Sequence, residues 1–454
     1  MKNRLLAKLL TLLAMSVLLM FALTMIQDVV EDRIRNQRNA VQSVVASLAG
    51  PQTLMGPAIV QGCTETTSVA NGRKTEYSTR EFQRIVLPDD LNHQAATRME
   101  ARSRSLHQVN TFVLKDRVTA SFGSLEPPKP LLPTGTVRCN APQLAFALSD
   151  SRGIRSVRIM AGQQALQAQP GSTLAQFPQG FHATLAPEPP GRQEALQVSL
   201  ELELVGTQSL AFAPLGQENT VRLDADWPHP SFGGSFLPTL REIGDDGFQA
   251  HWSLSALASS ARQDFLGDKA RCPANVACSG LETLGVDFVE PVNPYTLSDR
   301  ATKYGLLFIM LTFVAVGLFE VLKSLRVHPM QYLLVGAALC SFFLLLLSFS
   351  EHLEFGQAYA IAAAACTALL AYYASHILGS LRRGLPFASG IACLFGLLYV
   401  LLRLESTALI VGSVVLFAVL ALVMVLTRRV DWYAFGKYAP DEATQPAARQ
   451  EVAA

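Results

Sequence analysis

Charged residues are scarce in this chain of 454 residues. Asp, Glu, Lys and Arg make up 16% of the sequence, whereas hydrophobic residues make up 50%. A soluble domain usually carries about 25% charged residues. The deficit predicts that part of the chain lies outside water.

The sequence also lacks the short motifs of common enzyme classes. It contains no Gly-x-Ser-x-Gly elbow, no His-Glu-x-x-His motif, no Walker A loop and no Gly-x-Gly-x-x-Gly after a predicted strand. Histidines are scattered through the middle of the chain, and a triad could be drawn around them in almost any domain of this size. They are His93, His107, His182, His229 and His251. We therefore expect neither an enzyme nor a cofactor.

Neither sign of charge is in excess, because 37 Lys and Arg face 36 Asp and Glu. This balance excludes a basic nucleic-acid-binding protein and an acidic disordered tail. The charge is unevenly placed, with a net charge of −4 over residues 28–302 and +5 over the rest. A polar middle between apolar, slightly basic ends predicts a protein that contacts the lipid bilayer and carries one large soluble insertion.

Six apolar stretches are long enough to cross a bilayer, which takes about 20 residues of helix. The first, residues 9–26, follows three basic residues but lacks a small-x-small cleavage site, so we interpret it as an uncleaved anchor. The other five are residues 304–322, 330–350, 356–381, 384–402 and 406–427.

The predicted fold class is an α+β membrane protein with six transmembrane helices. Residues 1–27 form the N-terminal anchor and residues 28–302 a mainly β periplasmic domain. Residues 303–428 form a five-helix bundle and residues 429–454 a cytoplasmic tail.

Lysine and arginine in the short loops predict the orientation, because positively charged flanks stay in the cytoplasm. One set of loops carries basic residues alone: Lys323, Arg326, Arg382 and Arg383. The opposite set carries Glu351, His352 and Glu354 in one loop and Arg403 with Glu405 in another. The predicted protein crosses the membrane several times, with both termini in the cytoplasm and residues 28–302 outside.

Strand patterns dominate the segment between the membrane regions. A helix continues from the anchor until Gly50 and Pro51 stop it. Beyond that point, apolar and polar residues alternate in residues 196–204, 221–227 and 248–254, which predicts strands with one buried face. Clusters of Pro and Gly separate the strands.

Four of the seven cysteines lie in this middle segment: Cys63, Cys139, Cys272 and Cys278. In an oxidising compartment they could form two disulfides. Cys272 and Cys278 enclose five residues and are the candidate pair, although some thiols could also stay free. A zinc site is not expected, because no histidine lies close to these cysteines.

Several sequence blocks resemble the inner membrane protein CreD family of Gram-negative bacteria. They occur in the family's order from the anchor to the last helix, so the resemblance covers nearly the whole chain. The blocks are Gly50-Pro-Gln-Thr-Leu-Met-Gly-Pro57, Trp227-Pro-His-Pro-Ser-Phe232 with Phe236-Leu-Pro238, Gly247-Phe-Gln-Ala-His-Trp252, Asp299-Arg-Ala-Thr-Lys-Tyr304, His328-Pro-Met-Gln-Tyr-Leu-Leu-Val-Gly336, Ser350-Glu-His352 and Asp431-Trp-Tyr-Ala-Phe435.

The resemblance implies an inner-membrane envelope stress protein that is linked to the Cre two-component system and to colicin or β-lactam tolerance. It implies no reaction and no catalytic residues. The periplasmic domain would then bind or sense an envelope protein or a cell-wall component. The alternative is a transporter or efflux-like carrier that uses the helix bundle. Transporters usually show internal repeats and helices broken at mid-membrane, whereas Pro329 and Pro386 stand at predicted helix starts.

The most unusual segment of the middle domain is residues 227–238. Its prolines restrict the backbone, while Trp227, Phe232 and Phe236 offer apolar surface and His229 a polar group. This composition suits a preorganised loop that binds a ligand or partner. The simpler interpretation, which we favour, is a rigid turn whose aromatic side chains pack into the core.

Two further groups of residues are candidates near the membrane. Asp299, Arg300 and Lys303 lie where the middle domain meets the bundle, so they either mark the interface or couple the two parts. Glu320 and His376 are ionisable residues inside apolar stretches, which often have a function. Because both lie near predicted cytoplasmic ends, we favour simple anchoring, with Glu320 near Lys323 or Arg326.

Reporter fusions test the predicted orientation. Fusions after residues near 150, 353 and 404 should report the periplasm, and those near 326, 383 and 440 the cytoplasm, because the Lys and Arg bias changes side at each crossing. A cytoplasmic signal from the fusion near 150 would contradict the whole arrangement.

Overall fold

The structure is a computed structural model that describes residues 2–428 with several gaps. The tail at 429–454 and the block at 431–435 lie outside the described residues. The internal gaps are residues 72–73, 105–106, 124–127, 134, 187–194, 268–269, 271–277, 290–293, 324–326, 378–380 and 405–407.

The chain divides into two compact units. A helical unit contains Met1–Arg35 and Val292–Ala454, and a β unit contains Asn36–Pro291. This agrees with the predicted α+β organisation: an apolar N-terminal helix, a β-rich middle and several apolar C-terminal helices. Both ends of the predicted middle domain, residues 28–35 and 292–302, belong to the helical unit.

Seven helices contribute to the helical unit. They are α1 (Lys2–Ser47, up to Arg35), α3 (Pro294–Lys303), α4 (Gly305–Lys323), α5 (Pro329–Ser350), α6 (Phe355–Ile377), α7 (Leu381–Arg403) and α8 (Ala408–Thr427). Pro329 stands at the start of α5, but Pro386 lies inside α7.

Length and composition bear on the predicted number of spans. Among the described residues, four helices are long and apolar enough to cross a membrane, in α1, α5, α6 and α7. The bent pair of α3 and α4, with 45° between its halves, raises the number to five, and the apolar part of α8 is shorter. Six spans therefore stay a prediction.

Helix α5 contacts α3, α4 and α6 within the helical unit, and half of the residues in its apolar segment are buried. The ring of Phe342 on α5 lies 4.5 Å from that of Phe395 on α7 and 5.4 Å from that of Tyr359 on α6. The Tyr359 hydroxyl donates a 2.6 Å hydrogen bond to the carbonyl oxygen of Phe395. Aromatic packing and one satisfied polar group thus hold three helices together.

The β unit consists of two sheets. The nine-stranded sheet has the order β14-β17-β12-β1-β6-β10-β9, with β2 and β5 also paired to β1, and the eight-stranded sheet has the order β15-β16-β13-β3-β4-β11-β7-β8. The strands are β1 (Gln52–Asn71), β2 (Lys74–Val86), β3 (Asp90–Arg104), β4 (His107–Phe122), β5 (Gly135–Cys139), β6 (Gln143–Leu148), β7 (Ile154–Ala161), β8 (Gln164–Leu166), β9 (Gln169–Pro170), β10 (Gly180–Thr184), β11 (Leu196–Thr207), β12 (Ser209–Phe212), β13 (Glu218–Ala225), β14 (Pro230–Gly234), β15 (Leu240–Gly244), β16 (Gly247–Ser255) and β17 (Leu284–Phe288).

The three strands predicted from alternation are present as β11, β13 and β16. Their apolar residues face a common core, which includes Phe112, Phe212 and Trp252 from both sheets. The difference from the prediction is at Trp227, which lies beyond the end of β13 at Ala225. A short helix, α2 (Ala261–Leu266), adds Phe265 to the same core.

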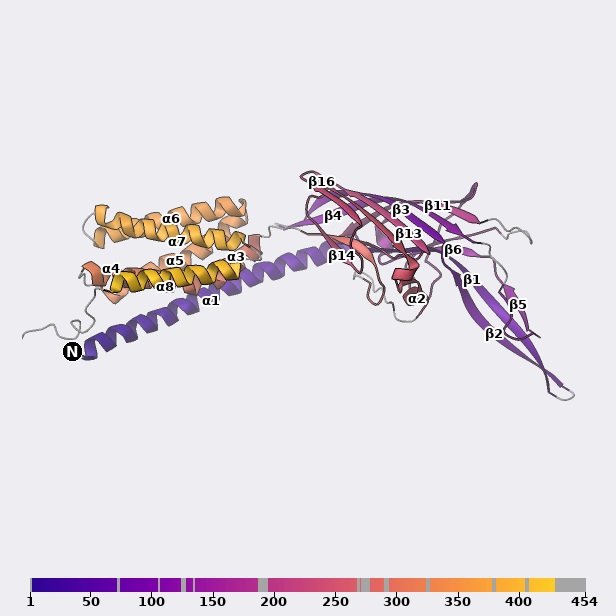
Figure 1. Cartoon of the computed structure of the whole chain (residues 1–454), viewed down its shortest axis with the longest axis horizontal. Helices are drawn as coiled ribbons and strands as arrows, with labels where there is room; N and C mark the ends of the chain where they lie inside the picture. The colour runs from indigo at the N-terminus through magenta and orange to yellow at the C-terminus, as the bar shows by residue number, and fades with distance from the viewer. Residues whose placement is uncertain are drawn as a thin grey trace, which may run out of the picture. The chain divides into compact units, whose positions relative to one another are not determined.

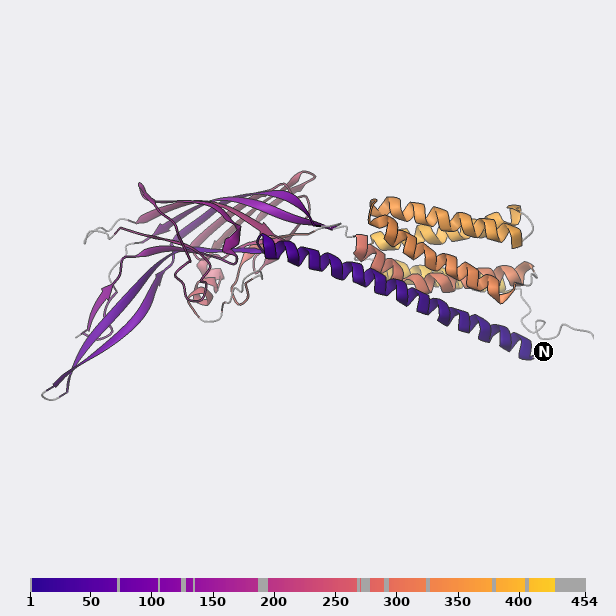
Figure 2. The same ribbon diagram turned by 180° about the vertical axis from the view of Figure 1, so that it is seen from behind.

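Strands β1 and β2 form a long hairpin that projects beyond the rest of the β unit, with β5 beside it (Figure 1, Figure 2). A disulfide joins Cys63 on β1 to Cys139, which lies directly opposite on β5. Cys278 is also disulfide-bonded. Its predicted partner Cys272 lies outside the described residues, so that pairing stays a prediction.

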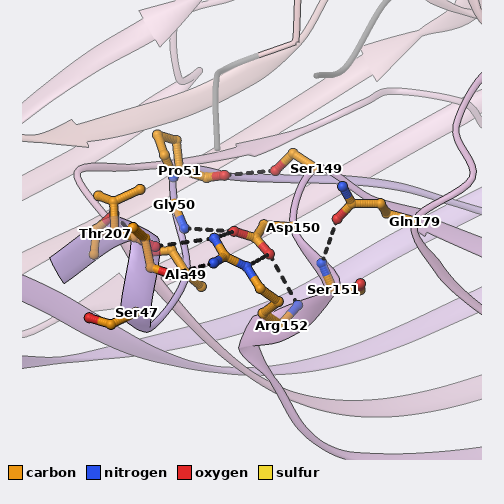
Figure 3. Close-up of polar contacts among 12 residues, drawn as sticks. Ser47, Ala49, Gly50, Pro51, Ser149, Asp150, Ser151, Arg152, Gln179 and Thr207 are labelled. Atoms are coloured by element: carbon orange, nitrogen blue, oxygen red, sulfur yellow. Dashed lines mark hydrogen bonds and ion pairs between the residues drawn. The ribbon is translucent and has the colours of Figure 1, made fainter. Parts of the chain in front are cut away.

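The last turn of α1 belongs to the β unit, where Arg152 satisfies its carbonyl groups (Figure 3). The Arg152 guanidinium donates hydrogen bonds to the carbonyl oxygens of Ala46 at 2.6 Å and Val45 at 3.1 Å. The Asp150 carboxylate accepts from Arg152 at 2.7 Å and from the backbone N–H of Gly50 at 3.0 Å. A helix end leaves several carbonyls without partners, and here one side chain binds two of them.

The turn after α1 is fixed by further buried hydrogen bonds (Figure 3). The Thr207 hydroxyl donates to the carbonyl oxygen of Ala49 at 3.1 Å, and the Ser149 hydroxyl to that of Pro51 at 2.7 Å. The Gln52 side chain donates to the carbonyl oxygens of Asp150 and Val205, both at 3.0 Å. These bonds connect the segment between α1 and β1 to both sheets.

The Asp150 carboxylate should make stability depend on acid pH. Burial alone would raise the pKa of this carboxyl, but hydrogen bonds from Arg152 and from the Gly50 backbone outweigh burial and hold the pKa below the ordinary 3.8. A lowered pKa stabilises the folded state above the unfolded-state pKa, and this contribution is lost as pH falls through the folded-state pKa. Asp150→Asn should lower the free energy of unfolding by about 2 kcal/mol at neutral pH and flatten its decline below about pH 4.

Urea unfolding of the full-length protein in detergent, followed by tryptophan fluorescence, measures this change. Arg155→Ala is the matched control, because Arg155 makes an exposed ion pair with Glu203 at 3.5 Å that should matter by at most about 1 kcal/mol. Equal stability of Asp150→Asn and wild type at neutral pH would contradict a stabilising role of the Asp150 carboxylate at the end of α1.

Candidate functional site

The predicted aromatic segment connects β13 to β15 and includes β14. Trp227, Phe232 and Phe236 are half-buried and pack against the core of the β unit, whereas His229 is exposed. The favoured interpretation, a turn anchored in the core, thus agrees with the packing. Part of each ring still reaches the surface, so the segment also offers apolar area to a partner.

Two indole N–H groups fix the path of this segment. The indole of Trp227 donates to the carbonyl oxygens of His229 at 3.0 Å and Val289 at 3.2 Å. The indole of the buried Trp252 on β16 donates to the carbonyl oxygen of Phe236 at 3.1 Å. These bonds satisfy both indoles and hold the backbone in one conformation.

Phe232 links the edges of the two sheets. It lies on β14, and its ring meets Phe248 at 5.5 Å and Trp252 at 5.9 Å between ring centroids, both in edge-to-face geometry. The Arg241 guanidinium on β15 lies 6.0 Å from the centroid of the same ring, which is within cation–π range. Phe232 thus supports the edge strand β15 from inside.

Exposed apolar side chains continue from this segment onto β15. Leu237 and Leu240 are each 68% exposed and Ile243 is 53% exposed. We call this surface, together with Phe232 and Phe236, the aromatic edge. Single exposed apolar residues are ordinary, but several along one sheet edge, next to a loop that two indole hydrogen bonds fix, mark a candidate binding surface.

A buried His–Asp pair lies in the core of the β unit. His93 Nδ1 on β3 lies 2.7 Å from Asp116 Oδ2 on β4, and the two side chains are 2% and 0% exposed. The Phe212 ring of the other sheet packs against His93 at 5.0 Å. Because neither group can reach a substrate, the pair is a structural element and not an accessible acid–base site.

The other predicted histidines do not gather around a common centre. His182 Nδ1 lies 2.6 Å from the carbonyl oxygen of Gly171, His251 is half-buried on β16, and the side chain of His107 lies outside the described residues. Across the described part of the chain, no group of three or more His, Cys, Asp or Glu side chains could hold a metal ion.

The predicted interface residues lie on α3. The Lys303 ammonium pairs with the Asp299 carboxylate at 2.7 Å, one helical turn away, and Arg300 has an interaction of its own. Lys303 is exposed and Asp299 is half-buried, and a pair within one helix is what simple interface marking requires. A coupling role stays a prediction.

Glu320 on α4 contacts a partner that the sequence did not indicate. Its Oε2 accepts a 2.9 Å hydrogen bond from the hydroxyl of Tyr332, whose side chain is buried on α5. Of the predicted partners, Arg326 and the side chain of Lys323 lie outside the described residues. His376 is exposed and stays on its own helix, with Nδ1 3.1 Å from the carbonyl oxygen of Tyr372.

Residues 4–433 match the sequence profile of the family described as inner membrane protein CreD. The chain belongs to the CreD family. The inner membrane protein CreD of Escherichia coli (strain K12) is 34% identical over 435 residues, which cover 96% of this chain and 95% of the relative.

Solved structures offer only weak similarities to this CreD family member. A mutant M1 zinc metallopeptidase from Deinococcus radiodurans is 14% identical, and the match covers 44% of this chain and 42% of that chain with a TM-score of 0.23. Another structure of an M1 zinc metallopeptidase from the same organism is 12% identical, with coverages of 75% and 90% and the same TM-score. At this TM-score the similarity carries no argument about fold or activity.

Some residues of interest in this CreD family member escaped sequence reasoning. Asp116 stands among inward-facing Leu114 and Val118 on β4, so the alternation itself marks it as a buried carboxylate. Tyr332 is a hydroxyl-bearing residue in an apolar helix, which is a usable signal. Arg241 could be found only from the structure, because its contact with Phe232 joins strands of different sheets.

Two substitutions in residues 227–238 of this CreD family member test which side chains stabilise the fold. Phe232→Ala should lower the free energy of unfolding by about 2 kcal/mol, because half-buried ring contacts with Phe248 and Trp252 are lost. His229→Ala should stay within about 0.5 kcal/mol of wild type, because the side chain is exposed. Urea unfolding measures both, and a large loss in His229→Ala would mean that its side chain has a structural role.

Proposed function

We propose that this CreD family member is a non-enzymatic inner-membrane protein of the envelope stress response. In this proposal six helices cross the membrane, both termini are cytoplasmic and the β unit lies in the periplasm. The β unit binds or senses an envelope protein or a cell-wall component, and the helical unit anchors it.

The disulfide between Cys63 and Cys139 supports the periplasmic location. Disulfides persist in oxidising compartments such as the periplasm and are rare in the cytoplasm. Both residues belong to the β unit, and the free cysteines Cys340, Cys366 and Cys393 all lie in the helical unit.

The aromatic edge is the observation that carries the binding function. Its backbone is fixed by the indole hydrogen bonds of Trp227 and Trp252, so little conformational freedom is lost when a partner binds. Aromatic residues such as Phe232 and Phe236 are enriched at protein interfaces, and Leu237, Leu240 and Ile243 add exposed apolar area.

We also propose that the protein is not an enzyme, and the burial of its His–Asp pair supports this. The His93–Asp116 pair has the residue types of a catalytic dyad, but its side chains are at most 2% exposed. A general base must come within hydrogen-bond reach of the proton that it abstracts, which burial prevents here.

The link to the Cre two-component system and to colicin or β-lactam tolerance comes from the resemblance to the family. In this proposal, a change at the aromatic edge reaches the helical unit, and Asp299, Arg300 and Lys303 on α3 are the candidates for that step. Coupling requires two states of α3 that a partner biases differently.

A transporter is the second candidate, favoured by Glu320. A carboxylate that accepts a hydrogen bond from the buried Tyr332 hydroxyl inside an apolar helix pair resembles the groups that carry protons or ions in carriers. The simpler role is to fix α4 against α5.

Glu320→Gln separates the two candidates. We expect near wild-type tolerance in cells that carry this variant, because the amide oxygen of Gln can still accept the Tyr332 hydrogen bond and a partly exposed contact contributes at most about 1 kcal/mol. Complementation of a strain without the family member, with membrane abundance measured by immunoblot, provides the assay. Glu354→Gln is the control, since Glu354 is exposed in the loop between α5 and α6.

The opposite result would support the carrier. An amide cannot titrate, so a transport cycle through Glu320 would be abolished in Glu320→Gln at normal abundance. That loss, combined with full tolerance after disruption of the aromatic edge by Phe232→Ala and Phe236→Ala, would overturn the binding function.

A further inference from the structure

The strands at the ends of the two sheets differ in how well they are protected from pairing. In the described part of the chain, β14 contains Pro230, β9 has two residues including Pro170, and β8 has three residues. Proline and short length prevent an edge from accepting another strand. Strands β2 and β5 also pair on one side only, with β1. Strand β2 carries several charged residues, which likewise protect an edge, and β5 is partly buried. Strand β15 has five residues without proline, and all five are exposed.

Among the described residues, no strand pairs with the outer side of β15. The strand pairs with β16 alone, from Leu240 opposite His251 to Gly244 opposite Gly247. An edge strand leaves alternate N–H and C=O groups unpaired on its outer side, and these groups can bind an extended chain. The side chains of Leu240 and Ile243 point to opposite faces of β15, so both faces of an added strand would meet apolar surface.

Carboxylates surround the hairpin end of β15. They line a hollow of about 590 Å³ and belong to Asp224, Asp226, Glu242 and Asp246. Arg222 pairs with Asp224 at 3.5 Å, and the backbone N–H of Met99 donates to Asp226. Glu242 and Asp246 form no ion pair within the described residues, so the hollow has uncompensated negative charge.

We propose that β15 accepts an extended, basic segment of an envelope protein as an additional strand. The segment's backbone pairs with the open side of β15, and its apolar residues contact Leu240 and Ile243. Its Lys or Arg side chains reach Glu242 and Asp246 in the hollow. This inference rests on the proposed function and names the chemistry of its partner.

A second copy of this chain fits the same surface less well. A two-fold dimer through β15 would place Glu242, Asp246 and the neighbouring carboxylates of one copy close to those of the other. Like charges that face each other across a strand pair are destabilising. A basic partner has the complementary charge.

Peptide binding to the full-length protein tests the proposal. The protein is placed in nanodiscs of phosphatidylcholine, which has no net charge and so does not attract basic peptides. The probes are fluorescent eight-residue peptides in which valine alternates with lysine or with glutamate, and a lysine peptide that is N-methylated at alternate residues. Fluorescence anisotropy should show binding about tenfold tighter for the lysine peptide than for either of the others.

Variants locate the site. Glu242→Lys combined with Asp246→Lys should weaken binding of the lysine peptide at least about tenfold, because attraction becomes repulsion. Glu81→Lys is the matched control, since Glu81 is an exposed carboxylate on β2, and should leave binding unchanged. A photo-crosslinking residue at Leu240 should form an adduct with the peptide, and one at Tyr77, which is 74% exposed, should not.

Three results would overturn the inference. Equal binding of the lysine and glutamate peptides excludes charge recognition. Equal binding of the N-methylated peptide excludes backbone pairing. An adduct between two copies of the chain from Leu240 without peptide assigns the surface to self-association.

The tolerance assay distinguishes this inference from the proposed function. Loss of tolerance in the Glu242→Lys and Asp246→Lys variant, without binding of any peptide, would leave the proposed function standing and reject the basic strand. Peptide binding as expected, with full tolerance in that variant, would keep strand addition and reject its place in the stress function.

Discussion

The structure of the β unit depends on how the carbonyl groups at the C-terminal end of helix α1 find hydrogen-bond partners inside it. Helix α1 stops beside two sheets, where its last carbonyl groups have no further helical turn to pair with. Arg152 donates hydrogen bonds to two of these carbonyls, and Asp150 balances its charge while it also accepts from the backbone N–H of Gly50 in the turn after the helix. The same short segment supplies Ser149, which holds the backbone at the start of β1. One helix end thereby sets where the first strand enters its sheet.

Periodicity in the sequence was enough to find most elements. Strands β11, β13 and β16 follow from strict alternation, and α5, α6 and α7 from apolar stretches of bilayer length. The disulfide between Cys63 and Cys139 did not follow, because it requires that β1 and β5 be neighbours although 76 residues separate the cysteines. Alternation also says nothing about the order of strands within a sheet, and here that order places residues 52 and 210 side by side.

Only part of the candidate site could be predicted from the sequence. Composition drew attention to Trp227, His229, Phe232 and Phe236, because proline and aromatic residues rarely concentrate without a reason. The open edge beside them was not visible, since whether β15 lies inside or at the end of a sheet is a property of topology. The contact of Glu320 could not be predicted either. Its partner Tyr332 lies on the next helix, and the sequence does not show how two helices pack.

The pairing of distant segments governs how the β unit can be made. Strand β1 runs parallel to β12, β3 runs parallel to β13, and β17 completes the first sheet beside β12. The nine-stranded sheet cannot be completed before β17, which ends at Phe288, and the eight-stranded sheet cannot be completed before β16, which ends at Ser255. Contacts between residues so far apart form slowly, and unpaired strands aggregate while they wait. Strand β1 therefore stays without its partner β12 until residue 212 has been synthesised, and during that time its unpaired edge can accept strands of other chains.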